Sequence, residues 1–207
     1  MDLYQKHGIP DAIRNQVIFL DASRYKTDPK DQLGTKIRQS FREAPDLVRL
    51  VAGLHLWRFV SNRDRTMGYF SDCWIDSHTM AEIMNSFRAS GQFGGSHKRD
   101  FVRNTLAILT HWNRLDYRLK IELKKDVVGY IGPTGSQKIF RKVTTHQGYV
   151  PAQEGKLALR VQGNAPVENI AEHRIGGHTQ FVVPRLAGLS YHNGENEYGK
   201  VMHHAAI

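Results

Sequence analysis

The hydrophobic pattern of this chain changes its period near residue 117, and that change restricts the fold class. Before it, residues 76–111 predict two helices, because apolar residues recur there every three or four positions. After it, residues 117–123 alternate strictly between polar and apolar, which is typical of a half-buried strand. One further strand is predicted before the helices and two after residue 123: residues 54–60, 127–131 and 181–183. Strands on both sides of a helical middle predict an α+β fold rather than alternating βαβ units.

Three further stretches complete this division of the chain. Residues 1–35 look irregular and predict an N-terminal extension. Apolar residues with helical spacing favour a helix over residues 35–52, interrupted by Pro45. Residues 190–207 predict a polar C-terminal tail. We therefore expect one folded domain over residues 36–189, which is long enough for a hydrophobic core.

The composition limits the partners that the chain can have. Its 207 residues carry a formal net charge of +9, which favours nucleic acid, an acidic neutralising protein or phosphorylated ligands as partners. The basic residues occur as short pairs among acids, so a scattered basic surface is an equally good interpretation. No apolar run approaches the roughly 20 residues that span a bilayer, and the first residues lack the apolar segment of a signal peptide. We expect no membrane association and a cytoplasmic site of action, reached directly or after delivery by another machine.

Metal and disulfide chemistry is not expected. Cys73 is the single cysteine, which excludes an internal disulfide framework and a cysteine metal cluster. The histidines form no credible ligand set, since even His173 and His178 stand on opposite sides of a Gly-Gly turn. RNP, zinc-finger and P-loop patterns are missing, and no paired carboxylates or HNH-like spacing favour a nuclease.

The segment Gly176-Gly177-His178-Thr179-Gln180 is the most informative polar motif. Glycines without Cβ allow backbone or ligand to come close, and Gln180 stands just before an apolar strand. A side-chain amide offers an acceptor and two donors without charge, so it can orient a hydroxyl or a water beside a cationic leaving group. From these residues alone, an ordinary turn that leads into a strand is the favoured interpretation.

Two upstream motifs could serve the same ligand. Arg58 lies near the end of the strand 54–60, and alternation places it on the face opposite its two aromatic neighbours. A guanidinium there can bind a diphosphate through its planar fork, although a solvent-exposed strand arginine is the simpler interpretation. Tyr69 and Phe70 could stack on a flat heterocycle, or they could belong to the core.

Taken in chain order, these motifs resemble the ADP-ribosyltransferase-like toxin superfamily. The resemblance covers roughly residues 54–184 and rests on the Arg58 strand, Gly68-Tyr69-Phe70-Ser71, Gly129-Tyr130-Ile131-Gly132 and the Gln180 strand. The Gly-Gly-x-x-Gln segment looks specifically like that of tuberculosis-necrotizing-toxin-type NAD glycohydrolases. It is also similar to toxin domains at the ends of polymorphic secreted proteins.

The resemblance implies a fold, an activity and a set of site residues. The fold would be an ADP-ribosyltransferase-like split β-sheet, with helices between its first and second strand groups and NAD bound by residues 36–189. The activity would be cleavage of the nicotinamide–ribose bond of NAD⁺, by hydrolysis or by ADP-ribosyl transfer to a nucleic-acid or protein acceptor. The resemblance assigns catalysis to Gln180, Arg58 and Tyr69, and NAD binding to Arg58, Phe70, Gly176 and Gly177. Transferases of the group usually carry an acidic residue where Gln180 stands, which favours hydrolysis or an unusual acceptor.

Two matters stay open at this point. A toxin of this kind would have an acidic immunity protein as a partner, which the net positive charge would suit. The same charge equally fits a module without enzymatic activity that binds nucleic acid or another partner.

Overall fold

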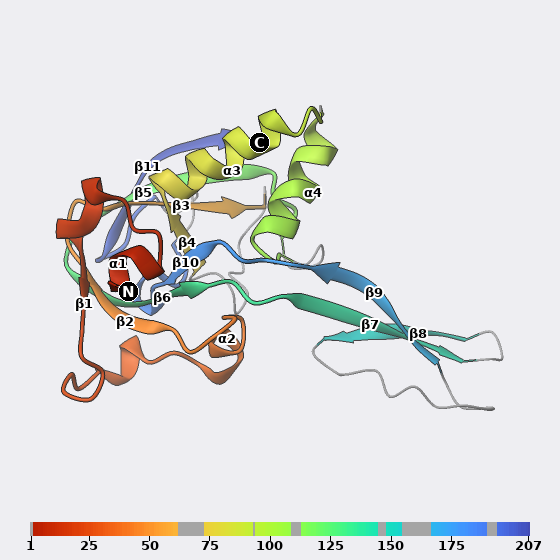
Figure 1. Ribbon diagram of the computed structural model, residues 1–207, viewed down its shortest axis with the longest axis horizontal. Helices are drawn as coiled ribbons and strands as arrows, with labels where there is room; N and C mark the ends of the chain where they lie inside the picture. Colours follow the sequence, from red (N-terminus) through yellow and green to blue (C-terminus); the bar gives the residue numbers. More distant parts are fainter. Residues whose placement is uncertain are drawn as a thin grey trace.

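An eight-stranded antiparallel sheet forms the centre of the molecule (Figure 1). The computed structural model describes residues 2–61, 73–92, 94–108, 113–144, 148–154, 167–189 and 194–207. The strand order is β1-β2-β6-β10-β4-β3-β5-β11, and every neighbouring pair is antiparallel. The strands are β1 (Val17–Phe19), β2 (Asp46–Leu50), β3 (His55–Val60), β4 (Cys73–Asp76), β5 (Tyr117–Leu123), β6 (Val127–Pro133), β10 (Thr179–Val182) and β11 (Gly199–Ala206). The predicted α+β class is confirmed.

Two longer helices stand between β4 and β5 in the chain and cover one face of the sheet. They are α3 (Ser77–Ala89) and α4 (Gly95–Thr105), close to their predicted positions. Asp76 caps α3, because its Oδ1 accepts hydrogen bonds from the backbone N–H groups of His78 (2.7 Å) and Thr79 (3.0 Å). The remaining helical segments are short: α1 (Leu3–Lys6), η1 (Asp11–Gln16), η2 (Pro29–Asp31), α2 (Thr35–Arg38) and η3 (Pro184–Leu186).

The two faces of the sheet bury different hydrophobic clusters. One face carries the largest cluster, in which Trp74, Leu119 and Phe181 pack with the N-terminal Ile9 and Val17. The opposite face carries two separate clusters. The first lies under α3 and α4 and contains Phe59, Ile75, Met80, Ile83, Met84, Val102 and Leu115. The second contains Leu33, Phe41, Leu47, Val128, Tyr130 and Val182.

The helix predicted over residues 35–52 is wrong. A single turn, α2, ends at Arg38, and the segment 46–50 forms β2 between β1 and β6. Leu47, Val48 and Leu50 are buried, so their spacing suits a strand that is covered on both faces as well as it suits a helix. Pairing with two neighbouring strands therefore decides the conformation of this segment.

Both chain ends belong to the sheet. The predicted polar tail contains β11, which pairs with β5 from Gly199 opposite Leu123 to Ala206 opposite Tyr117. At the other end β1 pairs with β2, and Val17 is fully buried. The sequence does not predict β11 because residues 199–206 lack a regular alternation of polar and apolar residues, and β1 is only three residues long.

A second sheet extends away from the body (Figure 1). It has the order β8-β7-β9 and consists of β7 (Gln137–Thr144), β8 (Gly148–Glu154) and β9 (Val167–Arg174). β7 follows β6 and β9 precedes β10, so this sheet leaves the large sheet from two of its central strands. Among the described residues, no helix is long and apolar enough to cross a membrane.

Candidate functional site

Gln180 lies near the middle of the large sheet, on the short strand β10. It is opposite Gly132 of β6, and β4 runs along the other side of β10. The Gln180 residue is only 6% exposed. Its amide is not one of the buried side-chain groups that lack a hydrogen-bond partner in the described part of the chain. A largely buried amide on a central strand is a candidate to hold a ligand, because it offers one acceptor and two donors without charge.

The position of Gln180 is at the boundary between the two clusters on the helix face. Strand register shows this, because Phe181 pairs with Trp74 and therefore Gln180 shares its face with Ile75. Ile75 belongs to the cluster under α3 and α4, whereas Val182, two residues after Gln180, belongs to the other cluster. Apolar groups on both sides of an amide exclude water and strengthen a hydrogen bond that it makes.

Tyr130 lies on the same face and pairs with Val182. Burial raises the pKa of its hydroxyl above the ordinary value for tyrosine, so the group stays neutral at physiological pH. The face around Gln180 therefore combines neutral polar groups with apolar ones.

The Gly176-Gly177 turn is tied to its surroundings by backbone hydrogen bonds. The Gly176 N–H donates to the Asn104 carbonyl (2.8 Å), and the Gly177 N–H donates to Thr134 Oγ1 (2.7 Å). Both glycines have positive φ, +70° and +116°, which other residues rarely adopt. A Cβ on Gly176 would lie 2.8 Å from two oxygens of Thr134. The space at Gly176 is thus filled by the protein itself rather than left for a ligand.

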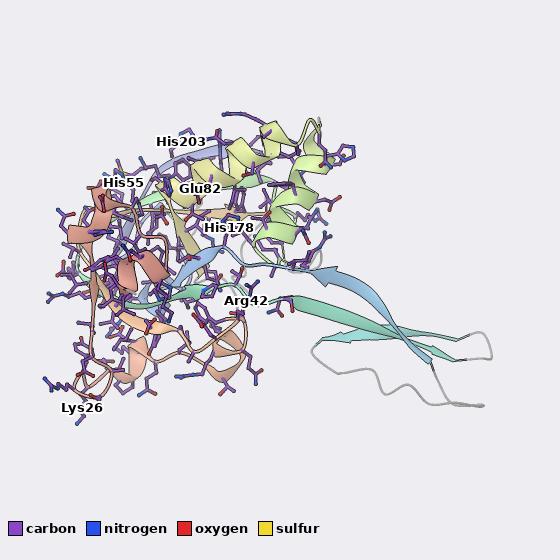
Figure 2. The ribbon with its side chains drawn as sticks, in the orientation of Figure 1. Lys26, Arg42, His55, Glu82, His178 and His203 are labelled. Carbon is purple, nitrogen blue, oxygen red and sulfur yellow. The ribbon has the colours of Figure 1, made fainter. Side chains whose placement is uncertain are left out.

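At Gly177 the neighbouring group is a cation. Arg42 Nη2 lies 3.1 Å from the position that a Cβ on Gly177 would take. Arg42 is exposed, and its backbone N–H donates to the Pro133 carbonyl at the end of β6 (2.9 Å). Figure 2 shows Arg42 and His178 near the junction of the large and small sheets. The sequence does not indicate that Arg42 lies beside Gly177. The segment around Arg42 was predicted to be a helix, and a helix prediction gives no information on contacts with distant residues.

Arg58 lies in the core on the other face. The alternation predicted for this strand is confirmed: Phe59 packs under the helices with Trp57 against it, whereas the Arg58 guanidinium lies over the Trp74 ring, 5.0 Å from its centroid. Arg58 is 6% exposed, so the interpretation as a solvent-exposed arginine is wrong. Trp57 pairs with Ile75, which shares its face with Gln180. Arg58 and Gln180 therefore lie on opposite faces of the sheet and are not brought together.

The remaining predicted site residues, Tyr69 and Phe70, lie outside the described residues. Their assignment stays a prediction. In the described ranges, no group of three or more His, Cys, Asp or Glu side chains could hold a metal ion.

Comparisons of the chain with protein-family models, with curated proteins and with solved structures found no match. The functional argument therefore depends on the site itself.

Proposed function

We propose that this chain is an NAD⁺-consuming enzyme with an ADP-ribosyltransferase-like split-sheet fold, and that Gln180 acts at the ribose. The observation that carries the proposal is the position of Gln180, which is 6% exposed and lies between two apolar clusters on one face of the sheet. Such an amide is suited to hydrogen-bond a ribose hydroxyl or an attacking water in a site of low dielectric.

The arrangement of the strands supports the same proposal. Three of the motifs that carry the resemblance are distant in sequence but lie on β3, β6 and β10 of one sheet, where β6 and β10 are neighbours and β4 separates β10 from β3. The two longer helices separate β3 and β4 from the later strands, as the resemblance implies. The Gly-Gly-x-x-Gln motif therefore leads into a central strand of the sheet rather than an edge strand.

Cleavage of the nicotinamide–ribose bond requires few protein groups. Attack on the ribose C1′ breaks its bond to the nicotinamide nitrogen, and the positive ring leaves as neutral nicotinamide with the bonding electron pair. With water as the nucleophile, the products are ADP-ribose, nicotinamide and a proton. With a macromolecular nucleophile, the ADP-ribosyl group stays attached to it. Gln180 would orient the nucleophile or the ribose, and the apolar clusters would limit access of other water.

A pair of substitutions at Gln180 tests the proposal. Gln180→Ala should lower the rate of NAD⁺ cleavage by about 10²-fold, the usual loss when one transition-state hydrogen bond is removed. Gln180→Glu should keep part of the activity and change the ratio of hydrolysis to transfer, since a carboxylate can also accept from the ribose. NAD⁺ loss is followed by fluorescence, and the products are separated into free and attached ADP-ribose.

The exposed Gln92 gives the matched control. Gln92→Ala should cleave NAD⁺ at the rate of the unaltered protein, and thermal unfolding of all variants should confirm that they are folded. A folded Gln180→Ala protein with the parental rate would show that the motif is only a turn. An unaltered protein that leaves NAD⁺ intact would instead favour the basic binding module.

A further inference from the structure

We propose that single-stranded nucleic acid binds the sheet face of β3, β5 and β11 beside α3, where a base stacks at Trp57 and phosphates contact Arg118 and Lys120. This surface is separate from the proposed NAD⁺ site, because it uses none of the residues assigned to cleavage. The proposal therefore holds whether or not the protein cleaves NAD⁺.

Strand register brings one aromatic ring and two basic side chains into a single row. Trp57 of β3 is opposite Lys120 of β5, and Lys120 is opposite His203 of β11. Lys120 Nζ lies over the Trp57 ring, 5.8 Å from its centroid, and the His203 ring meets Trp57 edge-on, with 6.5 Å between centroids. Leu119 and Ile121, on either side of Lys120, are fully buried in the largest cluster on the other face. Lys120 therefore lies on the face that also carries α3.

This row lies at the margin of the part that the helices cover. Trp57 and Lys120 are half-buried, and His203 is exposed. Trp57 Nε1 donates to the Oγ of Ser77 (3.0 Å), the first residue of α3. The ring is thus fixed in orientation by the start of the helix while part of it stays accessible to a ligand.

The charged side chains around the row are mainly basic. Arg118 stands two residues before Lys120 on the same face, and its Nε is buried without a hydrogen-bond partner among the described residues. Lys200 of β11 is exposed and pairs in register with Glu122, the one acidic residue of β5. Without the histidines, this face of β5 and β11 therefore carries three basic side chains and one acidic one. That balance complements a polyanion.

Single-stranded nucleic acid uses both the ring and the charges. Its unstacked bases can stack on aromatic side chains while its phosphates follow basic ones. Arg118 and Lys120 are two residues apart on one strand, or about 7 Å, which is comparable to the distance between successive phosphates of an extended single strand. A duplex keeps its bases stacked on one another, so it could use the cations but not Trp57.

Fluorescence anisotropy of a labelled oligothymidine of about twenty nucleotides tests the proposal. The unaltered protein should bind this strand more tightly than a duplex of the same length. Lys120→Gln should weaken binding and lower the slope of log Kd against log salt concentration by about 0.7, the value for one phosphate contact on a single strand. No binding by the unaltered protein, or an unchanged slope in Lys120→Gln, would overturn the proposal.

Trp57 is tested by two substitutions, because alanine there could also disturb the fold. Trp57→Ala should weaken binding by about 5- to 100-fold and leave the salt slope unchanged, as expected for one lost stacking contact. Trp57→Phe keeps a ring, so it should stay folded and bind more tightly than Trp57→Ala. The oligothymidine should quench the tryptophan fluorescence of the unaltered protein, and Trp57→Phe should lose this quenching. Full quenching in a folded Trp57→Phe protein would show that no base stacks at this position.

Lys26→Gln is the matched control. Lys26 is an exposed lysine whose loss changes the net charge equally, and Figure 2 shows it at another end of the molecule from His203. Lys26→Gln should bind the strand like the unaltered protein. A loss equal to that of Lys120→Gln would mean that only the overall charge attracts the strand, and the proposed surface would be wrong.

A polyglutamate peptide distinguishes nucleic acid from an acidic protein as the partner. It offers carboxylates but no bases, so it should bind more weakly than the oligothymidine and with equal affinity to Trp57→Phe and the unaltered protein. Tighter binding of polyglutamate, lost in Trp57→Phe, would overturn the proposal in favour of an acidic protein partner.

Discussion

Arg58 was a candidate to bind a diphosphate, but its position on a predicted strand does not by itself determine that role. The strand pattern correctly places it on the face opposite Trp57 and Phe59, but it cannot tell which face holds the ligand. The structure puts the guanidinium over the ring of Trp74, a residue of the main core, and leaves Arg58 only 6% exposed.

Arg58→Ala should therefore lower the free energy of unfolding by about 2–4 kcal/mol, because it removes buried packing and a cation–π contact. Urea unfolding measures this change. Arg58→Met, which keeps most of the stem, should recover part of the loss. If Arg58 instead binds the diphosphate of NAD⁺, Arg58→Ala should keep its stability and use NAD⁺ tens- to hundred-fold less well.

The Gly176-Gly177 turn is the element that joins β9 to β10, and its glycines have a structural reason. At Gly176, positive φ and close contact with Thr134 act together, so a side chain would be both strained and crowded. The sequence shows that glycine is needed there, but it does not show whether the space is used by a ligand or by another strand.

Gly176→Ala should lower the free energy of unfolding by about 2–4 kcal/mol, the sum of left-handed strain and overpacking. Gly8→Ala is the control: its φ is also positive at +62°, but nothing lies within 4 Å of the added Cβ, so only the strain of about 1–2 kcal/mol should appear. Chemical denaturation compares the two variants. Equal losses would mean that contact with Thr134 contributes nothing.

Predictability differs between elements for a physical reason. Strands β3, β5 and β6 and helices α3 and α4 could be predicted because one local period dominates each of them. β2 and β11 could not, since pairing with distant strands decides their conformation. The same division applies to the site. Gln180 stands in a local motif, whereas Arg42 reaches Gly177 only through contacts between segments more than 100 residues apart.

At the scale of the whole molecule, the two ends of the chain are joined through η3. Arg185 Nη2 lies 3.1 Å from Asp31 Oδ2, its Nε also donates to Asp31, and its Nη1 lies 3.2 Å from the Tyr198 hydroxyl. The Asp31 side chain is 9% exposed and that of Arg185 is 19% exposed. The N-terminal segment is therefore an integral part of the domain that carries Gln180, because its contacts reach the residues directly after β10.

Arg185→Ala should lower the free energy of unfolding by about 3 kcal/mol, because it leaves the Asp31 carboxylate buried without its partner. Asp31→Asn in the same background should recover part of that loss, since the uncompensated charge is removed. Arg24→Ala provides the control: Arg24 is 87% exposed and pairs with Asp21 at 3.2 Å, so its loss should cost less than about 1 kcal/mol. Urea unfolding at neutral pH measures all three. A loss in Arg185→Ala no larger than that in Arg24→Ala would mean that the N-terminal segment contributes little through this contact to the stability of the sheet.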